Sequence, residues 1–151
     1  MKKIKLGMIG GGIGSFIGAV HRNAAWLDGA YELTAGAFSS DPERSKASGI
    51  ELGLSGDRVY TSYREMIETE SQMDPGERIQ AVAIVTPNHV HFEPAMMALE
   101  HGFHVIIDKP IALNVEEAVQ LRDKANESGR ILGLTHTYTG YPMIKEARYR
   151  I

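Results

Sequence analysis

The sequence has no cysteine, a single tryptophan and no long apolar run among its 151 residues. Without cysteine, the chain can form neither disulfides nor thiolate metal sites, and it has no cysteine nucleophile. No apolar stretch approaches the ~18 residues that a membrane-spanning helix needs. The basic start of the chain is followed by glycines, not by the apolar segment and cleavage site of a secretory signal, so we expect no such signal.

A strong charge of either sign is also missing. The 16 Lys and Arg residues against 19 Asp and Glu residues give a net charge of −3, and the chain has no basic block, which argues against a nucleic-acid-binding surface. Hydrophobic residues make up 43% and charged residues 23%, as in an ordinary globular protein. We therefore expect a compact cytoplasmic protein that binds neither nucleic acid nor a membrane.

Strand and helix patterns alternate along the chain. Helical spacing of apolar residues, with capping residues at helix starts and glycines at helix ends, predicts a helix between each pair of successive strands. Such alternation indicates an α/β fold of the Rossmann type, with a doubly wound, mostly parallel sheet, helices on both faces and two three-strand halves. The short apolar segments that predict strands are residues 4–9, 31–38, 59–60, 81–85, 103–107 and 131–135.

Glycine is abundant: the chain has 16 glycines, and six of them fall between Gly7 and Gly18. In a turn between a strand and a helix, glycines let a diphosphate approach the backbone and the helix N-terminus. Gly10 and Gly12 match the dinucleotide spacing G-x-G-x-x-G, but Gly18 follows three residues later than that spacing requires. The residues expected to contact a dinucleotide here are Gly10, Gly12, Ile13, Gly14, Ser15, Phe16 and Ile17.

The end of the second strand should hold the group that reads the cofactor's ribose. An acidic residue there binds the 2′-hydroxyl of NAD, but this sequence has Ser39 and Ser40. Asp41 precedes a proline and suits a helix cap better. Two serines with Arg44 and Lys46 close behind accommodate a 2′-phosphate, which a carboxylate would repel. We therefore predict NAD(P) and favour NADP slightly over NAD; alternatively, Arg44 and Lys46 are only solvated on a helix face.

Two further turns follow buried strands. Residues 86–91 read Thr-Pro-Asn-His-Val-His, and residues 108–110 read Asp-Lys-Pro. Both turns lie at carboxyl ends of strands, where open α/β sheets bind ligands. A lysine at that edge, Lys109, can donate a hydrogen bond to a substrate oxygen and transfer a proton.

With these turns the sequence resembles the glucose–fructose oxidoreductase, inositol dehydrogenase and rhizopine-catabolism (Gfo/Idh/MocA) family over essentially its whole length. The resemblance is carried by the glycine turn, residues 39–44, the two turns at residues 86–91 and 108–110, and residues 135–142. It implies an NAD(P)-dependent dehydrogenase or reductase that acts on a sugar, a polyol or a related carbonyl compound.

The resemblance also implies roles for individual residues. Thr86, Pro87 and Asn88 line the path of the cofactor, and His91 lies close to it. Lys109 orients the reacting hydroxyl and assists its proton transfer. One further residue, Asp108, contacts the ribose on the nicotinamide side, where the family usually has glutamate.

Residues 1–140 are expected to form an NAD(P)-binding Rossmann domain. Residues 141–151 look like the start of a helix that leads to a second domain, which is absent here. The resemblance implies that this second domain supplies much of the substrate pocket and the contacts of a homo-oligomer. The expected partner is therefore a small, sugar-like molecule.

Several histidines and glutamates have either a functional or a simpler structural interpretation. His136 and Tyr138 follow the last strand, and we expect them either to lie near the nicotinamide or to have no such role. His89 and His91 lack the spacing of metal ligands, so we predict no metal. His21 is expected to pack or to face solvent, and Glu65, Glu68 and Glu70 are expected to form a solvated acidic face.

Two alternatives to the enzyme interpretation stay open. The first is a dinucleotide-binding or regulatory module without chemistry of its own. The second is a methyltransferase that binds S-adenosylmethionine at a similar glycine turn, although that function does not explain the Asp108-Lys109-Pro110 turn.

Overall fold

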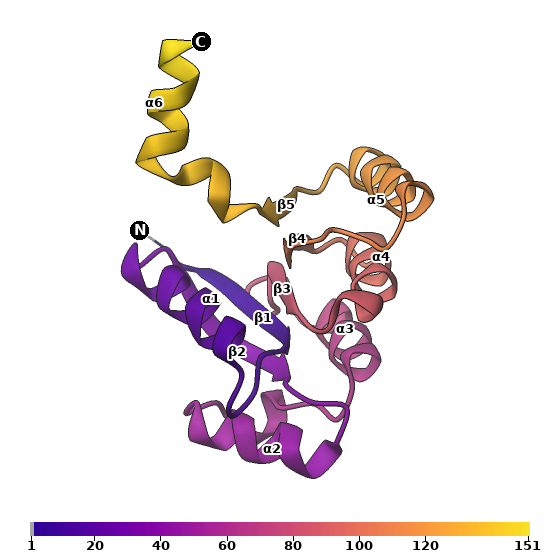
Figure 1. Cartoon of the computed structure of the whole chain (residues 1–151). Helices are drawn as coiled ribbons and strands as arrows, with labels where there is room; N and C mark the ends of the chain where they lie inside the picture. The colour runs from indigo at the N-terminus through magenta and orange to yellow at the C-terminus, as the bar shows by residue number, and fades with distance from the viewer. Residues whose placement is uncertain (1) are drawn as a thin grey trace.

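The computed structural model describes residues 2–151, so Met1, the first residue of the expected cofactor domain, lies outside the described residues. Strands and helices alternate along the chain (Figure 1). The strands are β1 (Ile4–Gly10), β2 (Tyr31–Ala37), β3 (Ala81–Val85), β4 (His104–Asp108) and β5 (Leu132–Thr135). The α-helices are α1 (Phe16–Leu27), α2 (Pro42–Glu51), α3 (Tyr63–Gln72), α4 (Phe92–Glu100), α5 (Val115–Ser128) and α6 (Pro142–Arg150). Three short 3₁₀ helices are η1 (Gly56–Arg58), η2 (Asn88–Val90) and η3 (Thr137–Gly140).

The sheet is parallel and has the order β2-β1-β3-β4-β5. The chain runs from β1 outward to β2 on one side and then returns to β3 on the other. This reversal next to β1 is the topological switch point at which doubly wound sheets bind their ligands, outside the carboxyl ends of the strands. The α/β fold of the Rossmann type is thus confirmed.

The predicted strand at residues 59–60 is wrong. Val59 makes only one isolated bridge to Gly36, beside β2. The segment lies between η1 and α3, which leaves too few extended residues to continue a ladder. The described residues therefore contain five strands instead of six, and the interpretation of two three-strand halves is wrong with it.

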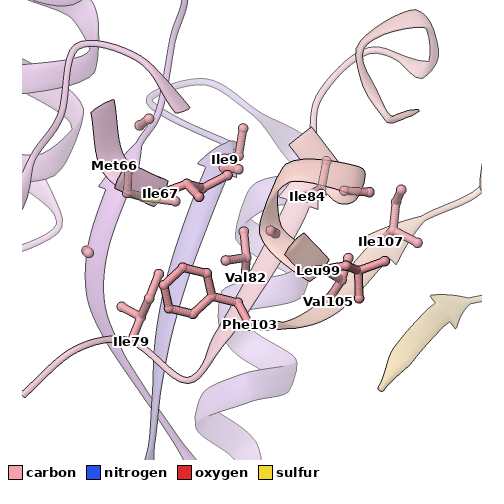
Figure 2. Close-up of a cluster of buried hydrophobic side chains, with 14 of the residues drawn as sticks. Ile9, Met66, Ile67, Ile79, Val82, Ile84, Leu99, Phe103, Val105 and Ile107 are labelled. Atoms are coloured by element: carbon pink, nitrogen blue, oxygen red, sulfur yellow. The ribbon is translucent and has the colours of Figure 1, made fainter. Parts of the chain in front are cut away.

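Each strand sends alternate side chains to the two faces of the sheet. On one face, Val82 and Ile84 of β3 pack with Leu99 of α4 and with α3 and α5 in a large apolar cluster (Figure 2). On the other face, Ala83 and Val85 belong to a smaller cluster that includes residues of α1. Because both faces of β3 are covered, its sequence is continuously apolar.

Helix starts follow the capping residues of the sequence. The Asp41 carboxylate accepts hydrogen bonds from the amides of Glu43 (2.9 Å) and Arg44 (3.1 Å) at the start of α2. Asn114 caps α5, and Gly129 ends that helix with a left-handed φ of 64°. These contacts confirm Asp41 as a helix cap, and Asn114 and Gly129 show the same local chemistry at the two ends of α5.

The expected acidic face on α3 is wrong at one position. Glu70 is completely buried, and its carboxylate accepts two hydrogen bonds of 2.8 Å from Arg58. The hydroxyl of Tyr60 (2.9 Å) and the amide of Ile79 (3.0 Å) also donate to it. The reason is pairing: a buried carboxylate is tolerated where it is ion-paired and fully hydrogen-bonded.

Candidate functional site

The glycine turn packs its backbone tightly against the first turns of α1. Gly10 and Gly11 have φ angles of 77° and 74°, which favour glycine. A Cβ atom on Gly18 would lie 2.4 Å from the Cα of Gly11. Gly18 therefore takes the packing part of the third glycine in the dinucleotide pattern, despite its later position.

The additional residues of the turn are tied to α2. The amide of Ile13 donates to the hydroxyl of Ser48 at 3.0 Å, and the Arg44 guanidinium donates to the carbonyl of Ile13 at 3.1 Å. Ser15 caps α1 by accepting a hydrogen bond from the amide of Gly18 at 3.1 Å. The longer turn is thus held at its middle and at its end.

Arg22 is a cation beside the glycine turn that sequence patterns did not reveal. Its guanidinium donates a hydrogen bond to the carbonyl of Gly11. Burial lowers the pKa of this guanidinium from its ordinary value. An arginine on a helix gives no sequence signal of such a contact, because it usually faces solvent.

A first cavity of about 850 Å³ brings together segments far apart in the sequence. The glycine turn forms one wall, the end of β2 another, and the turn after β3 a third. Its lining contains Arg44 but no aspartate or glutamate. The predicted site residues that line it are Gly10, Gly12, Ile13, Gly14, Ser15, Ile17, Ser39, Ser40, Arg44, Thr86 and Pro87.

A second cavity of about 690 Å³ lies on the α1 face of the sheet. Asp108 and Lys109 line it at the end of β4, together with Phe16, which is 82% exposed. Ile17 lines both cavities, so they adjoin at the start of α1. Aromatic residues Tyr138 and Tyr141 complete the lining near the end of the chain.

Two side chains lie next to the Asp108 carboxylate. The hydroxyl of Thr135 donates to its Oδ1 atom at 2.9 Å, and the Nε2 atom of His21 lies 3.6 Å from the same oxygen. The side chains of His21 and Asp108 are 9% and 15% exposed. His21 packs as expected, but the sequence did not reveal its polar contact, because its partner is distant in the chain.

Three predicted residues line neither cavity. Asn88 begins η2. His91 is fully buried, with both ring nitrogens near backbone carbonyls, so the structure does not bring its side chain to the cavity. His136 is exposed and contacts the Tyr138 ring edge-on, with 6.0 Å between ring centroids.

Within residues 2–151, no group of three His, Asp or Glu side chains is arranged to hold a metal ion. None of the helices described there combines the length and the apolar character that crossing a membrane requires.

Comparisons with known proteins agree with this geometry. Residues 4–136 match the Gfo/Idh/MocA family model, described as an oxidoreductase family with an NAD-binding Rossmann fold. The uncharacterized oxidoreductase YfiI of Bacillus subtilis is 38% identical over 151 residues, which are 99% of this chain and 38% of that protein. The 1,5-anhydro-D-fructose reductase of Ensifer adhaerens is 32% identical over 80% of this chain and 34% of its own length.

Solved structures show the same similarity. An inositol dehydrogenase homolog from Azotobacter vinelandii, complexed with NADH and myo-inositol, is 42% identical, with a TM-score of 0.92 over 98% of this chain and 38% of that one. An oxidoreductase from Sinorhizobium meliloti is 53% identical, with a TM-score of 0.90 over 99% of this chain and 41% of that one. The chain thus spans only 38% of YfiI and of the inositol dehydrogenase homolog. The chain belongs to the Gfo/Idh/MocA oxidoreductase family, and residues 4–136 are its NAD-binding Rossmann domain.

Proposed function

We propose that a nicotinamide dinucleotide lies across the carboxyl edge of the sheet, from the first cavity to the second. The observation that carries this proposal is the adjacency of the two cavities at Ile17. The glycine turn lines one of them and Lys109 lines the other. In this arrangement the diphosphate meets the start of α1, and the nicotinamide comes close to Lys109.

The residues of the first cavity fit an anionic ligand. Amides in the first turn of a helix have no partner within the helix, and they carry partial positive charge. The lining adds Arg44 and no carboxylate, so nothing there repels a diphosphate. A Cβ on Gly12 would lie 2.5 Å from the Ser48 hydroxyl, so only glycine lets the turn pack this closely against α2.

The chemistry assigned to this chain is positioning and proton transfer. When bound, the nicotinamide supplies the hydride chemistry. Lys109 donates a hydrogen bond to the reacting oxygen of the substrate and gives or takes its proton. Asp108, fixed by Thr135, lies beside Lys109 and holds the ribose on the nicotinamide side.

The proposed substrate is a sugar, a polyol or a related carbonyl compound. Relatives of this chain include a 1,5-anhydro-D-fructose reductase and a levoglucosan dehydrogenase. The second cavity combines the polar groups of Asp108 and Lys109 with the rings of Tyr138 and Tyr141, which suits a ring that carries hydroxyl groups. The family assignment gives no support to the methyltransferase alternative.

The test is turnover of the full-length protein with NAD(P)H or NAD(P)⁺ and a panel of sugars and inositols. Lys109→Ala should lower kcat by about 10²–10⁴-fold, because it removes the proton-transferring group, while cofactor affinity stays the same. Lys124→Ala on α5 is the control and should keep full activity. Unchanged kcat in Lys109→Ala would reject the proposed role of Lys109. A wild-type protein that binds the cofactor tightly but converts none of these compounds would favour a binding module.

We further propose that NADP is preferred slightly over NAD. Asp41 is engaged as a helix cap, and Ser39, Ser40 and Arg44 line the first cavity, so a 2′-phosphate meets hydroxyls and a cation there. The Azotobacter vinelandii homolog was solved with NAD⁺ and with NADH. The test compares dissociation constants. NADPH should bind more tightly than NADH, and Arg44→Ala should weaken the binding of NADPH more than the binding of NADH. A clear NADH preference would contradict the proposal.

The domain division also remains a proposal. We propose that residues 1–140 act as the cofactor domain and that residues 141–151 lead to a second domain for substrate binding and homo-oligomer contacts. The greater length of the relatives supports this, as does α6, which is exposed throughout and stands away from the sheet (Figure 1). A cytoplasmic location, and the lack of nucleic-acid or membrane partners, belong to the same proposal. Sedimentation of the full-length protein tests the oligomer.

A further inference from the structure

His91 is the last residue of the turn at residues 86–91, and its ring also contacts the turn at residues 108–110. Its Nδ1 atom is 2.7 Å from the carbonyl oxygen of Pro110, and its Nε2 atom is 2.9 Å from the carbonyl oxygen of Thr86. The side chain is completely buried. One ring therefore connects the chain after β3 with the chain after β4, next to the start of α4.

Both partners of the ring can only accept hydrogen bonds. A neutral imidazole donates from one nitrogen, and the imidazolium donates from both. Each contact is short enough to be a full hydrogen bond when its nitrogen carries the proton. The neutral ring therefore donates to one of the two carbonyls at a time, and the imidazolium donates to both. We call the two contacts the Thr86 arm and the Pro110 arm.

The two arms reach different parts of the proposed site. Thr86 lines the first cavity, next to the glycine turn. Pro110 directly follows Lys109, which lines the second cavity. The residues on both sides of Lys109 thus have side-chain contacts: the Asp108 carboxylate accepts a hydrogen bond from Thr135, and the Pro110 carbonyl lies 2.7 Å from Nδ1 of His91.

We propose that His91 is a positioning residue that sets the two cavities relative to each other. Its Thr86 arm fixes the wall against which the cofactor binds, and its Pro110 arm fixes the backbone that carries Lys109. The proposal rests on the proposed function, but it assigns His91 no contact with the cofactor or the substrate.

Two substitutions separate the arms, because the amide nitrogen of asparagine can replace Nδ1 and that of glutamine can replace Nε2. His91→Asn keeps a donor for Pro110 and loses the Thr86 arm. His91→Gln keeps a donor for Thr86 and loses the Pro110 arm. His101→Asn is the matched control, since Nδ1 of His101 also lies 2.8 Å from a carbonyl, that of Met97, at the far end of α4.

In the full-length protein, His91→Gln should lower kcat by about tenfold or more, because a displaced Lys109 no longer meets the reacting oxygen, while the KM for the cofactor changes little. His91→Asn should raise the KM for the cofactor and leave kcat within about twofold. Equal changes of both parameters in both variants, in proportion to lost thermal stability, would overturn the proposal and leave His91 a packing residue.

A second readout needs no cofactor and no turnover. Amide hydrogen exchange of the full-length protein should rise at residues 108–111 in His91→Gln and at residues 86–90 in His91→Asn. The same exchange pattern in both variants would overturn the proposal. Selective exchange together with a wild type that binds no cofactor would instead keep the positioning role and refute the proposed function.

Discussion

Gly18 is the residue on which the glycine turn depends most clearly. A methyl group at this position would lie 2.4 Å from the Cα atom and 2.5 Å from the carbonyl oxygen of Gly11. Both atoms are backbone, so the strain cannot be relieved by turning a side chain. The turn would have to move, and with it the amides that we propose for the diphosphate.

Gly18→Ala should therefore lower the free energy of unfolding by about 1–3 kcal/mol, as overpacking does elsewhere. It should also weaken cofactor binding to the protein that remains folded. Urea denaturation and calorimetric titration with NADPH measure the two effects. Gly56→Ala is the control, because a Cβ there meets open space. Unchanged binding in folded Gly18→Ala would show that the turn does not hold the cofactor.

Some single residues could be predicted from the sequence and others could not. Apolar runs predicted where β3 and β4 end, and therefore that Thr86 and Lys109 lie at the carboxyl edge of the sheet. The burial of Glu70 could not be predicted, because Glu65, Glu68 and Glu70 have the same side chain. Only the pairing of Glu70 with Arg58 distinguishes it from the other two. The contact of His21 with Asp108 likewise depends on how α1 packs.

The buried carboxylate of Glu70 joins three elements of the fold. It lies on α3 and pairs with Arg58 of η1, and it accepts a hydrogen bond from the backbone just before β3. Tyr60 adds its hydroxyl from the segment that forms the isolated bridge next to β2. This network therefore ties α3 to η1, to the segment before β3 and to the segment that pairs with β2.

Tyr60 makes this network sensitive to alkaline pH. Burial, and then the hydrogen bond to Glu70, raise the pKa of its phenol above the usual value near 10. The folded protein keeps this proton above pH 10 while the unfolded chain releases it, so the contribution of Tyr60 is full below about pH 10 and is lost as pH rises further.

Tyr60→Phe should thus lower the free energy of unfolding at about pH 8. It should lower it less at about pH 11, where the wild type has already lost part of the contribution of Tyr60. Urea denaturation of both proteins at the two pH values measures the difference. Tyr149→Phe, at an exposed position on α6, controls for tyrosine ionisation in general. A Tyr60→Phe cost that does not change with pH would refute the coupling.

Elements could be predicted where local chemistry decides them. Helix α2 begins at its aspartate cap and α5 ends at a left-handed glycine, both of which a sequence shows directly. The segment at residues 59–60 has strand-forming residues, but strand pairing depends on neighbours distant in sequence. In this segment only Val59 forms a bridge, to Gly36. Local propensity could not show that the pairing stops after one residue.

At the scale of the whole molecule, strands β1, β3 and β4 end at one edge of the parallel sheet. The two cavities adjoin there, at the first turn of α1. The alternation of strands and helices predicted this edge, but it did not predict how the site divides into two cavities or that His91 bridges their walls. Those features depend on packing between segments.

We propose that one nicotinamide dinucleotide binds at this edge, between the glycine turn and Lys109. Calorimetric titration of the full-length protein with NADPH and NADH measures this binding. We expect saturable binding of one cofactor per chain, weakened in Gly18→Ala and retained in Lys109→Ala. Absence of binding to the folded wild type, or binding that Gly18→Ala leaves unchanged, would contradict it.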